Sequence, residues 1–211
     1  KWILAIKNSF FIGILSTILA TILGTCAAVG LARDEMPFRR FITALLLSPM
    51  IVPLIITAAG MFFFYSNLGL AGGYLGVILA HAALGTPFVI ITVTATLTGF
   101  DYSLARAALN LGATPIRVFF DVIMPLIRPG VISGALFAFI TSFDEVVVIL
   151  FMAGPQQRTI PRQMFSGLRE QINPSILAIA TLLILLSIAL LVTLELLRRR
   201  AERMRGIEIP H

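Results

Sequence analysis

Two adjacent carboxylates, Asp144 and Glu145, are the residues of this sequence best suited to do chemistry. They lie about 15 residues into an apolar stretch that begins at Pro129, which places them roughly 22 Å from its start at a helical rise of about 1.5 Å per residue. Carboxylates at such depth in a membrane are costly and usually face a bundle interior or a watery cavity. The pair suits a ligand that carries an ammonium group, because a desolvated ammonium needs opposite charge and hydrogen-bond acceptors. The alternative is that the pair caps or braces broken helices and never meets a solute.

His81 is a second titratable group within an apolar stretch. We place it near a helix end and expect it to be interfacial or hydrogen-bonded rather than a ligand. Together with Asp144 and Glu145 it could also form a proton or ion relay, which leaves a coupled secondary transporter as an alternative function. The sequence shows no zinc-ligand spacing, Gly-rich phosphate loop or nucleophile elbow. We therefore predict a chain that is not itself an enzyme and holds no cofactor.

The composition is typical of an integral membrane protein. Hydrophobic residues make up 58% of the chain and charged residues 12%, with a mean hydropathy of +0.99, which excludes an ordinary soluble domain. Several stretches are long enough to cross a bilayer as helices. The predicted spans are residues 10–31, 41–65, 74–97, 129–152 and 176–197. We predict an all-α, polytopic helix bundle that forms a single transmembrane domain over residues 1–211.

Small residues and prolines predict how these spans pack and bend. Pro49 and Pro53 predict a bend in the cytoplasmic half of the second span, and Gly85-Thr86-Pro87 predicts a break in the third. The first span carries small residues at three- and four-residue spacing, which favours close helix–helix contact. These residues are Gly13, Thr17, Ala20, Thr21, Gly24 and Ala28.

The distribution of basic residues predicts the orientation. The net charge of +6 could suggest a nucleic-acid partner, but the basic residues gather in the connections and the tail, as membrane orientation requires. The more basic side, which we assign to the cytoplasm, carries Arg33, Arg39, Arg40, Arg106, Arg117, Arg128, Arg198, Arg199, Arg200, Arg203 and Arg205. The opposite side carries Lys1, Lys7, Arg158, Arg162 and Arg169. Residues 153–173 are therefore predicted to be a periplasmic loop.

Residues 101–128 form a cytoplasmic connection with its own helix start and stop signals. Asp101 or Ser103 can cap a short helix, because their side-chain oxygens can accept from the first free backbone N–H groups. Gly112 can take the left-handed conformation that ends such a helix.

A second helix follows in the same connection. Thr114 can cap it, and Pro115 falls at its first position, where a missing N–H is harmless. We predict that it ends just before Pro125 and that Pro129 starts the next span. The resulting helix–turn–helix lies outside the bilayer and suits docking into a groove of another protein.

This connection resembles the EAA loop of permease subunits in binding-protein-dependent ABC importers, whose pattern is roughly Glu-Ala-Ala, three residues, Gly-Ala, then a Leu-Pro and a Pro-Gly. The matching residues are Ala107, Ala108, Gly112, Ala113, Pro125, Pro129 and Gly130. Arg106 stands where the family has its glutamate. In such importers the loop fits a cleft on the ATP-hydrolysing subunit. The resemblance therefore implies an ATPase-coupling surface formed by Arg106, Ala107, Ala108, Gly112, Ala113, Thr114 and Pro115.

Two further stretches resemble the permeases of spermidine/putrescine-type importers. They are the Ser-Phe-Asp-Glu-Val-Val-Val run that contains the acidic pair and the segment from Ile160 to Pro174. The resemblance implies a permease in the bacterial inner membrane, forming half of the pathway for polyamines or a related amine-bearing solute. It implies that Asp144 and Glu145 belong to that pathway.

The same resemblance implies the partners of the chain. They are a homologous permease subunit, two ATPase subunits that bind ATP and Mg, an external solute-binding protein, and membrane lipid. We expect Arg158, Arg162 and Arg169 to meet acidic residues of the binding protein. Because subunits of this type usually have a further helix before the first span seen here, we also expect one more N-terminal helix before Lys1.

Overall fold

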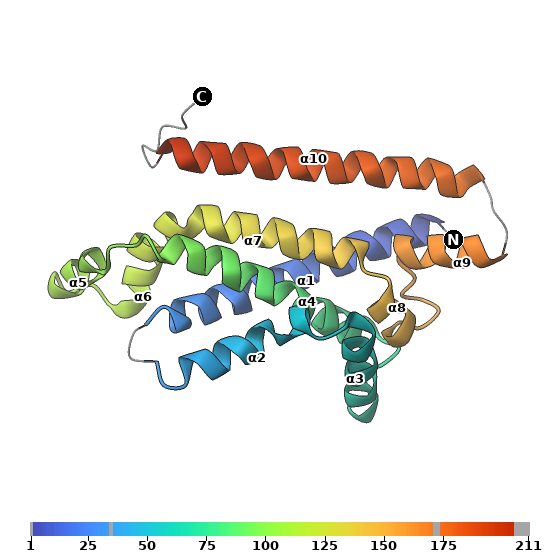
Figure 1. Cartoon of the computed structure of the whole chain (residues 1–211), viewed down its shortest axis with the longest axis horizontal. Coiled ribbons are helices and arrows are strands. Elements are labelled where there is room, and N and C mark those ends of the chain that lie inside the picture. The colour runs from blue at the N-terminus through green and yellow to red at the C-terminus, as the bar shows by residue number, and fades with distance from the viewer. Residues whose placement is uncertain (1, 34–35, 171–173, 205–211) are drawn as a thin grey trace.

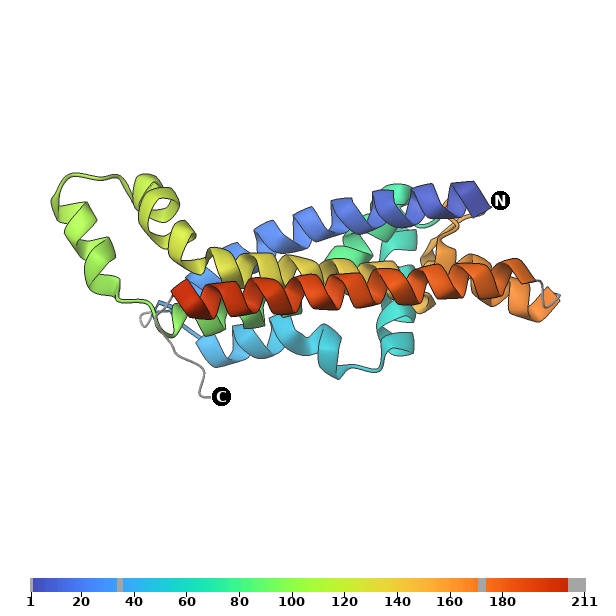
Figure 2. The same cartoon turned by 90° about the horizontal axis from the view of Figure 1, so that it is seen from above.

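The computed structural model describes residues 2–33, 36–170 and 174–204, and every regular element within them is helical. The elements are α1 (Trp2–Leu31), α2 (Arg39–Ile51), α3 (Leu54–Asn67), α4 (Tyr74–Leu97), α5 (Tyr102–Asn110), α6 (Pro115–Val118), the π-helix η1 (Phe119–Ile123), α7 (Met124–Asp144), α8 (Val147–Met152), α9 (Ile160–Glu170) and α10 (Pro174–Met204). In Figure 1, α1, α4, α7 and α10 run along the long axis. The segment α5–α6 lies at one end of this bundle and α8–α9 at the other, and Figure 2 shows the same arrangement from above.

Several of these helices are long and apolar enough to cross a membrane. In the described residues three qualify by themselves: Trp2–Leu31, Tyr74–Leu97 and Pro115–Asp144. The pair α2 and α3 qualifies only when taken together. The predicted fifth span lies within α10, where the shorter apolar stretch is Leu177–Thr193. The all-helical, multi-span architecture is confirmed, whereas the number of five spans stays a prediction.

The core is formed where α1, α4 and α7 pack together at small residues. A Cβ atom on Gly24 of α1 would lie 2.6 Å from the Cβ of Val89 in α4, and one on Gly85 of α4 would lie 3.0 Å from the Cβ of Ala138 in α7. The small-residue face predicted for the first span is thus confirmed: its glycines and alanines are buried, and its two threonines are half-buried. Such close backbone approach gains dispersion contacts that larger side chains would prevent.

The third span matches helix α4 in both bounds, but the predicted break at Gly85-Thr86-Pro87 is wrong. The helix continues through Pro87, which is buried between its neighbours. Thr86 donates its hydroxyl to the carbonyl oxygen of Ala82 at 2.7 Å. The helix is continuous despite the hydrogen bond that Pro87 cannot make, and it packs tightly at Gly85 two residues earlier.

The second span is broken rather than gently bent. Helix α2 continues through Pro49 and ends at Ile51, and α3 starts at Leu54 with its axis turned by 107°. Val52 is extended at φ −72° and ψ 134°, as expected for a residue before Pro53. The break falls at Pro53, one of the two prolines from which the bend is predicted, after about 20 Å of helix.

The helix that leaves the cytoplasmic connection does not end before Pro125. It runs unbroken from Pro115 to Asp144 through the π-helix η1, in which Met124 donates its N–H to the oxygen of Phe119, five residues earlier. The π-helical turn directly precedes Pro125 and, with its bonds five residues apart, accommodates the N–H that this proline lacks. The expectation that Pro129 starts a new span is wrong for the same reason.

Candidate functional site

The acidic pair lies at a break in the fourth predicted span. Helix α7 ends at Asp144, Glu145 is extended at φ −73° and ψ 128°, and α8 begins at Val147. The expectation of one helical span over residues 129–152 is therefore wrong. The chain instead directs the two side chains apart by leaving the helical conformation between them.

Glu145 stabilises this break by capping α8. Its Oε1 accepts from the N–H of Val147 at 2.8 Å, and its Oε2 accepts from the N–H groups of Val148 at 2.8 Å and Ile149 at 3.3 Å. These are the backbone donors that the first turn of a helix leaves unpaired. Only 6% of Glu145 is exposed, so the carboxylate replaces water for all three. The structure thus gives Glu145 the capping role that the sequence left as an alternative.

A buried polar network adjoins this cap. Nδ1 of His81 lies 2.8 Å from Oγ of Ser142, and Ser16 donates to the same oxygen at 2.9 Å. Nε2 of His81 lies 3.8 Å from Oε2 of Glu145. His81 is the eighth residue of α4 and only 1% exposed, so its expected position near a helix end is wrong. Its expected hydrogen bond is confirmed.

Asp144 is exposed and faces a cavity of about 460 Å³. The cavity is lined by Pro49, Met50, Leu54, Leu84, Phe88, Ile140, Thr141, Asp144, Glu145, Val146 and Val147. Pro49, Met50 and Leu54 flank the break between α2 and α3. The two broken spans therefore meet at one cavity whose walls are mainly apolar and whose exposed acid is Asp144.

The caps and the turn of the connection over residues 101–128 form as the sequence predicts. Asp101 caps α5 by accepting from the N–H of Ser103 at 2.9 Å, and Gly112 ends the turn after α5 at φ 87°. Thr114 accepts from the N–H of Arg117 at 3.4 Å. The hydroxyl of Ser103, 2.7 Å from Asp101, and then its N–H lower the pKa of the Asp101 carboxyl.

The predicted coupling residues lie on this connection near a set of exposed apolar side chains. Arg106, Ala107, Gly112, Thr114 and Pro115 are exposed, and Ala108 and Ala113 are half-buried. The exposed apolar side chains are Tyr102, Leu104, Leu109, Leu111, Ile116 and Phe120, of which Leu111 is 89% exposed. Exposed apolar groups on a segment at the end of the bundle are typical of a protein-binding surface.

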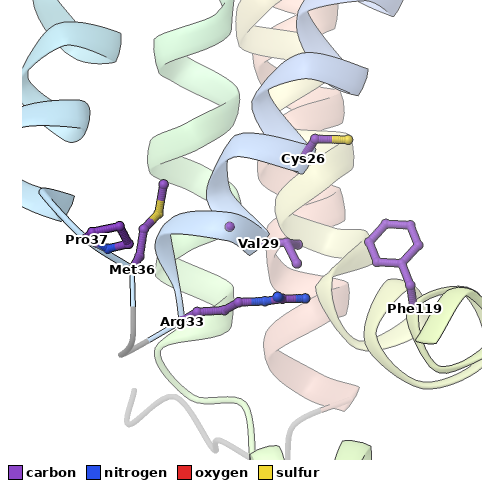
Figure 3. A pocket seen from close by; sticks show the side chains of 7 residues that line it. Cys26, Val29, Arg33, Met36, Pro37 and Phe119 are labelled. Carbon is purple, nitrogen blue, oxygen red and sulfur yellow. The ribbon is translucent and has the colours of Figure 1, made fainter.

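A second cavity, of about 600 Å³, lies where this connection meets the end of α1. It is lined by Cys26, Val29, Gly30, Arg33, Met36, Pro37 and Phe119. Figure 3 shows Arg33 extending beneath Val29 toward the side on which Phe119 of η1 lies. The π-helical turn therefore borders open space on the side of α1.

The segment predicted to be a periplasmic loop contains helix α9 over residues 160–170, and its side of the membrane stays a prediction. Asn8 of α1 donates to the carbonyl oxygens of Gln156 at 2.8 Å and Arg158 at 2.9 Å, and Ser9 accepts from the N–H of Ile160 at 2.9 Å. These bonds fix the loop to the start of α1.

The three arginines expected to dock a binding protein differ in their surroundings. Arg162 donates through Nη1 to the carbonyl oxygens of Ala153 at 2.9 Å and Gly154 at 3.0 Å. Burial, and then the charge of Arg158, lower the pKa of Arg162. Arg158 is half-buried, and the side chain of Arg169 lies outside the described part of the chain. The guanidinium of Arg162 thus has a structural task within the loop.

The structure brings His81, Asp144 and Glu145 to one level of the bundle and places the predicted coupling residues at one end of it. Sequence reasoning missed Ser16 and Ser142, which connect α1 and α7 to His81. A usable signal was present, because Ser142 is a polar residue only three positions before Glu145 in an apolar stretch. Among the described residues no group of three or more His, Cys, Asp or Glu side chains could hold a metal ion.

Known protein families and individual proteins match this chain over most of its length. Residues 20–203 match the family described as the binding-protein-dependent transport system inner membrane component. The chain is 30% identical over 205 residues to the spermidine/putrescine transport system permease protein PotC of Shigella flexneri, covering 97% of this chain and 78% of that protein. It is 36% identical to the putrescine transport system permease protein PotI of Escherichia coli K12, with 85% and 66% covered. It is also 33% identical to the molybdenum transport system permease protein ModB of Mycobacterium bovis, with 85% and 72% covered.

Solved structures show the same fold at lower sequence identity. The MetNI methionine ABC transporter in an inward-facing form has a chain that matches with a TM-score of 0.70 and 18% identity, covering 99% of this chain and 96% of that one. A bacterial ABC transporter that imports alginate matches with a TM-score of 0.66 and 18% identity, covering 84% and 62%. The family match over residues 20–203 and the relatives at 30% identity and above show that this chain belongs to the family of inner membrane components of binding-protein-dependent transport systems.

Proposed function

We propose that this chain forms half of the membrane pathway of an ATP-driven importer for polyamines such as spermidine and putrescine. The other half is a homologous permease subunit, and two ATPase subunits and an external solute-binding protein complete the complex in a bacterial inner membrane. The chain itself catalyses no covalent reaction, because ATP and Mg are bound by the ATPase subunits. Support for the substrate class comes from the relatives in spermidine/putrescine and putrescine systems.

The observation that carries the proposal is the placement of Asp144. Its carboxylate is exposed toward the cavity at the two broken spans, whereas the neighbouring Glu145 is occupied by α8. Phe88 lines the same cavity. A carboxylate with an aromatic ring suits an ammonium group, since both attract positive charge in a site of low polarity. Asp144 is then the pathway acid, and Glu145 contributes to the pathway by shaping its wall.

Coupling to ATP hydrolysis is assigned to residues 101–128. The small residues around Gly112 allow close approach of an ATPase subunit, and the exposed Leu111 and Ile116 supply apolar contacts. Arg106, which replaces the glutamate of the family motif, is exposed beside this surface. The unbroken helix from Pro115 to Asp144 joins this surface to the cavity.

Docking of the solute-binding protein is assigned to the outer loop and its arginines, Arg158, Arg162 and Arg169. Because Arg162 already donates to two carbonyl oxygens of the loop, its reversal should disturb the loop as well as the docking. Reversal of Arg158 to Glu should weaken docking while leaving those two bonds in place. Unchanged affinity of the complex for its binding protein would count against this assignment.

The secondary-transporter alternative loses its support. A relay through Asp144, Glu145 and His81 would require Glu145 to give up its three backbone donors in a buried site, which is costly. The chain also belongs to a family of importer subunits that act with a binding protein.

The test is uptake of labelled spermidine and putrescine by the complete complex in vesicles, with molybdate as the competing solute class. Asp144→Asn should weaken uptake by about 10- to 150-fold, as expected for the loss of a charged hydrogen bond of about 1.5–3 kcal/mol. The matched control is Asp144→Glu, which keeps a carboxylate at the cavity and should retain most of the uptake. Full uptake by Asp144→Asn, or transport of molybdate in place of polyamines, would overturn the proposal.

A further inference from the structure

Four polar side chains from separate parts of the sequence form one buried chain in the middle of the bundle. They are Ser16 of α1, Ser142 of α7, His81 of α4 and Glu145 between α7 and α8. Each is at most 6% exposed. Consecutive members lie 2.9, 2.8 and 3.8 Å apart. Burying polar groups in an apolar bundle is unfavourable unless they are paired, so this arrangement calls for a reason beyond packing.

The hydrogen-bond directions along this chain are consistent with one another. Oγ of Ser16 lies 2.7 Å from the carbonyl oxygen of Ile12 and 2.9 Å from Oγ of Ser142. With the single Ser16 proton directed at Ser142, the Ser142 hydroxyl donates to Nδ1 of His81 at 2.8 Å. A neutral His81 then carries its proton on Nε2. Nε2 is buried and makes no hydrogen bond to any described residue, and it lies 3.8 Å from Oε2 of Glu145. The free N–H of His81 therefore points its partial positive charge at the carboxylate that caps α8.

Glu145 is the point at which this network can act on the pathway. Its two oxygens hold the first turn of α8 and thereby the extended backbone at Glu145. Asp144 directly precedes that backbone and faces the cavity. Val148 and Ile149 of α8 share an apolar cluster with Ala58 of α3, so the same cap also supports the far side of the break in the second span.

From this geometry we infer that His81 is a positioning residue for transport. Through Ser142 and Glu145 it fixes the break between α7 and α8, and so fixes where Asp144 meets a solute. This inference rests on the proposed pathway at Asp144. It assigns to His81 no contact with the solute.

The first test is a double-mutant cycle on uptake by the complete complex, with His81→Leu, Asp144→Asn and the double variant, each normalised to the amount of assembled complex. If His81 acts through Asp144, the effect of His81→Leu becomes smaller when Asp144 is already Asn, by about threefold or more. His81→Gln keeps one acceptor and one N–H donor and should restore part of the uptake. Independent, multiplicative effects of the two variants would overturn the inference.

The second test needs no transported solute, so it separates this inference from the polyamine proposal. Cys26 is the one cysteine of the sequence, and Cys26→Ser provides a background in which Asp144→Cys can be labelled with a small thiol reagent. Adding Ser142→Ala, a milder variant than His81→Leu, should change the labelling rate by about threefold or more. Ser133→Ala, on α7 but outside the network, should leave it unchanged. Equal labelling rates of Asp144→Cys with and without Ser142→Ala would overturn the inference, even if polyamine uptake is confirmed. A changed labelling rate in a complex that takes up no polyamine would remove the substrate class and keep His81 as a positioning residue for the pathway.

Discussion

Asp144 and Glu145 are neighbours in sequence but occupy different environments, because the helix ends between them. Glu145 is buried and holds three backbone N–H groups, and Asp144 is exposed to the cavity. One carboxylate thus makes the break stable, and the break in turn makes the other available. Adjacent acids in a membrane span therefore need not act as a pair.

Replacing Glu145 should destabilise the protein more than replacing Asp144. Glu145→Ala removes a helix cap, worth about 0.5–2 kcal/mol, and leaves buried N–H groups unpaired at about 1–3 kcal/mol each. Glu145→Gln keeps one acceptor oxygen and should lose less. Thermal unfolding of the purified complex in detergent measures both, with Asp144→Asn as the control. Equal midpoints for Glu145→Ala and the wild-type chain would show that the cap contributes nothing.

The cap of α5 should depend on pH in one direction. Hydrogen bonds from Ser103 lower the pKa of Asp101, so its stabilisation is complete above the unfolded value of about 3.9 and is lost as the pH falls through the lower, folded value. Amide exchange in α5, corrected for its intrinsic pH dependence, should therefore accelerate only in strong acid. Asp101→Asn caps without titrating and should show no such step. A step in the Asn variant as well would assign the effect to another group.

At the scale of elements, the sequence predicts the helices well where local signals decide and poorly where neighbours decide. The caps at Asp101 and Thr114 and the turn at Gly112 depend on nearby backbone groups, and all three are confirmed. Pro87 and Pro125 look like helix ends locally, yet both helices continue because packing and a π-helical turn accommodate them. The break at Glu145 was missed since no Gly or Pro marks it.

Close packing of α1 on α4 can be tested with two glycines of the same helix. Gly24→Ala places a methyl group 2.6 Å from the Cβ of Val89 and should destabilise the protein by about 1–3 kcal/mol through overpacking. At Gly30 nothing lies within 4 Å of an added Cβ, so Gly30→Ala should be neutral or stabilising by about 0.5–1 kcal/mol. Thermal unfolding again reports the difference. Equal stability of the two variants would refute the close contact.

At the scale of the whole molecule, the fold separates two surfaces at opposite ends of α7. The coupling segment lies at one end and the cavity at the other, as Figure 2 shows for the segment that projects beyond the bundle. Family membership could be predicted from the sequence, because the spacing of the coupling motif is local. The contact of the two broken spans at one cavity could not be predicted from the sequence, because it depends on how helices far apart in sequence pack together.

A charge on the exposed coupling surface should uncouple transport without unfolding the chain. Leu111 is 89% exposed, so Leu111→Asp should change the free energy of unfolding by no more than about 0.5 kcal/mol. The ATPase subunits should nevertheless co-purify less and hydrolyse ATP without driving uptake. Leu68→Asp, at an exposed leucine of the turn after α3, is the control. Normal co-purification of the ATPase subunits with the Leu111→Asp variant would show that they bind to another surface.

In the proposed importer, the unbroken helix from Pro115 to Asp144 would act as a lever between the coupling segment and the cavity. Its 30 residues measure about 45 Å, and its closest approach to α4 is at Gly130 and Gly134, where an added Cβ would lie 2.5 Å from threonine oxygens. A pivot there leaves arms of about 25 Å and 18 Å. A tilt of about 5° would then shift the coupling end by about 2 Å one way and Asp144 by about 1.5 Å the other. If the ATPase subunits drew together the coupling ends of this helix and of its counterpart in the proposed second permease subunit, the opposite ends of the two helices would move apart.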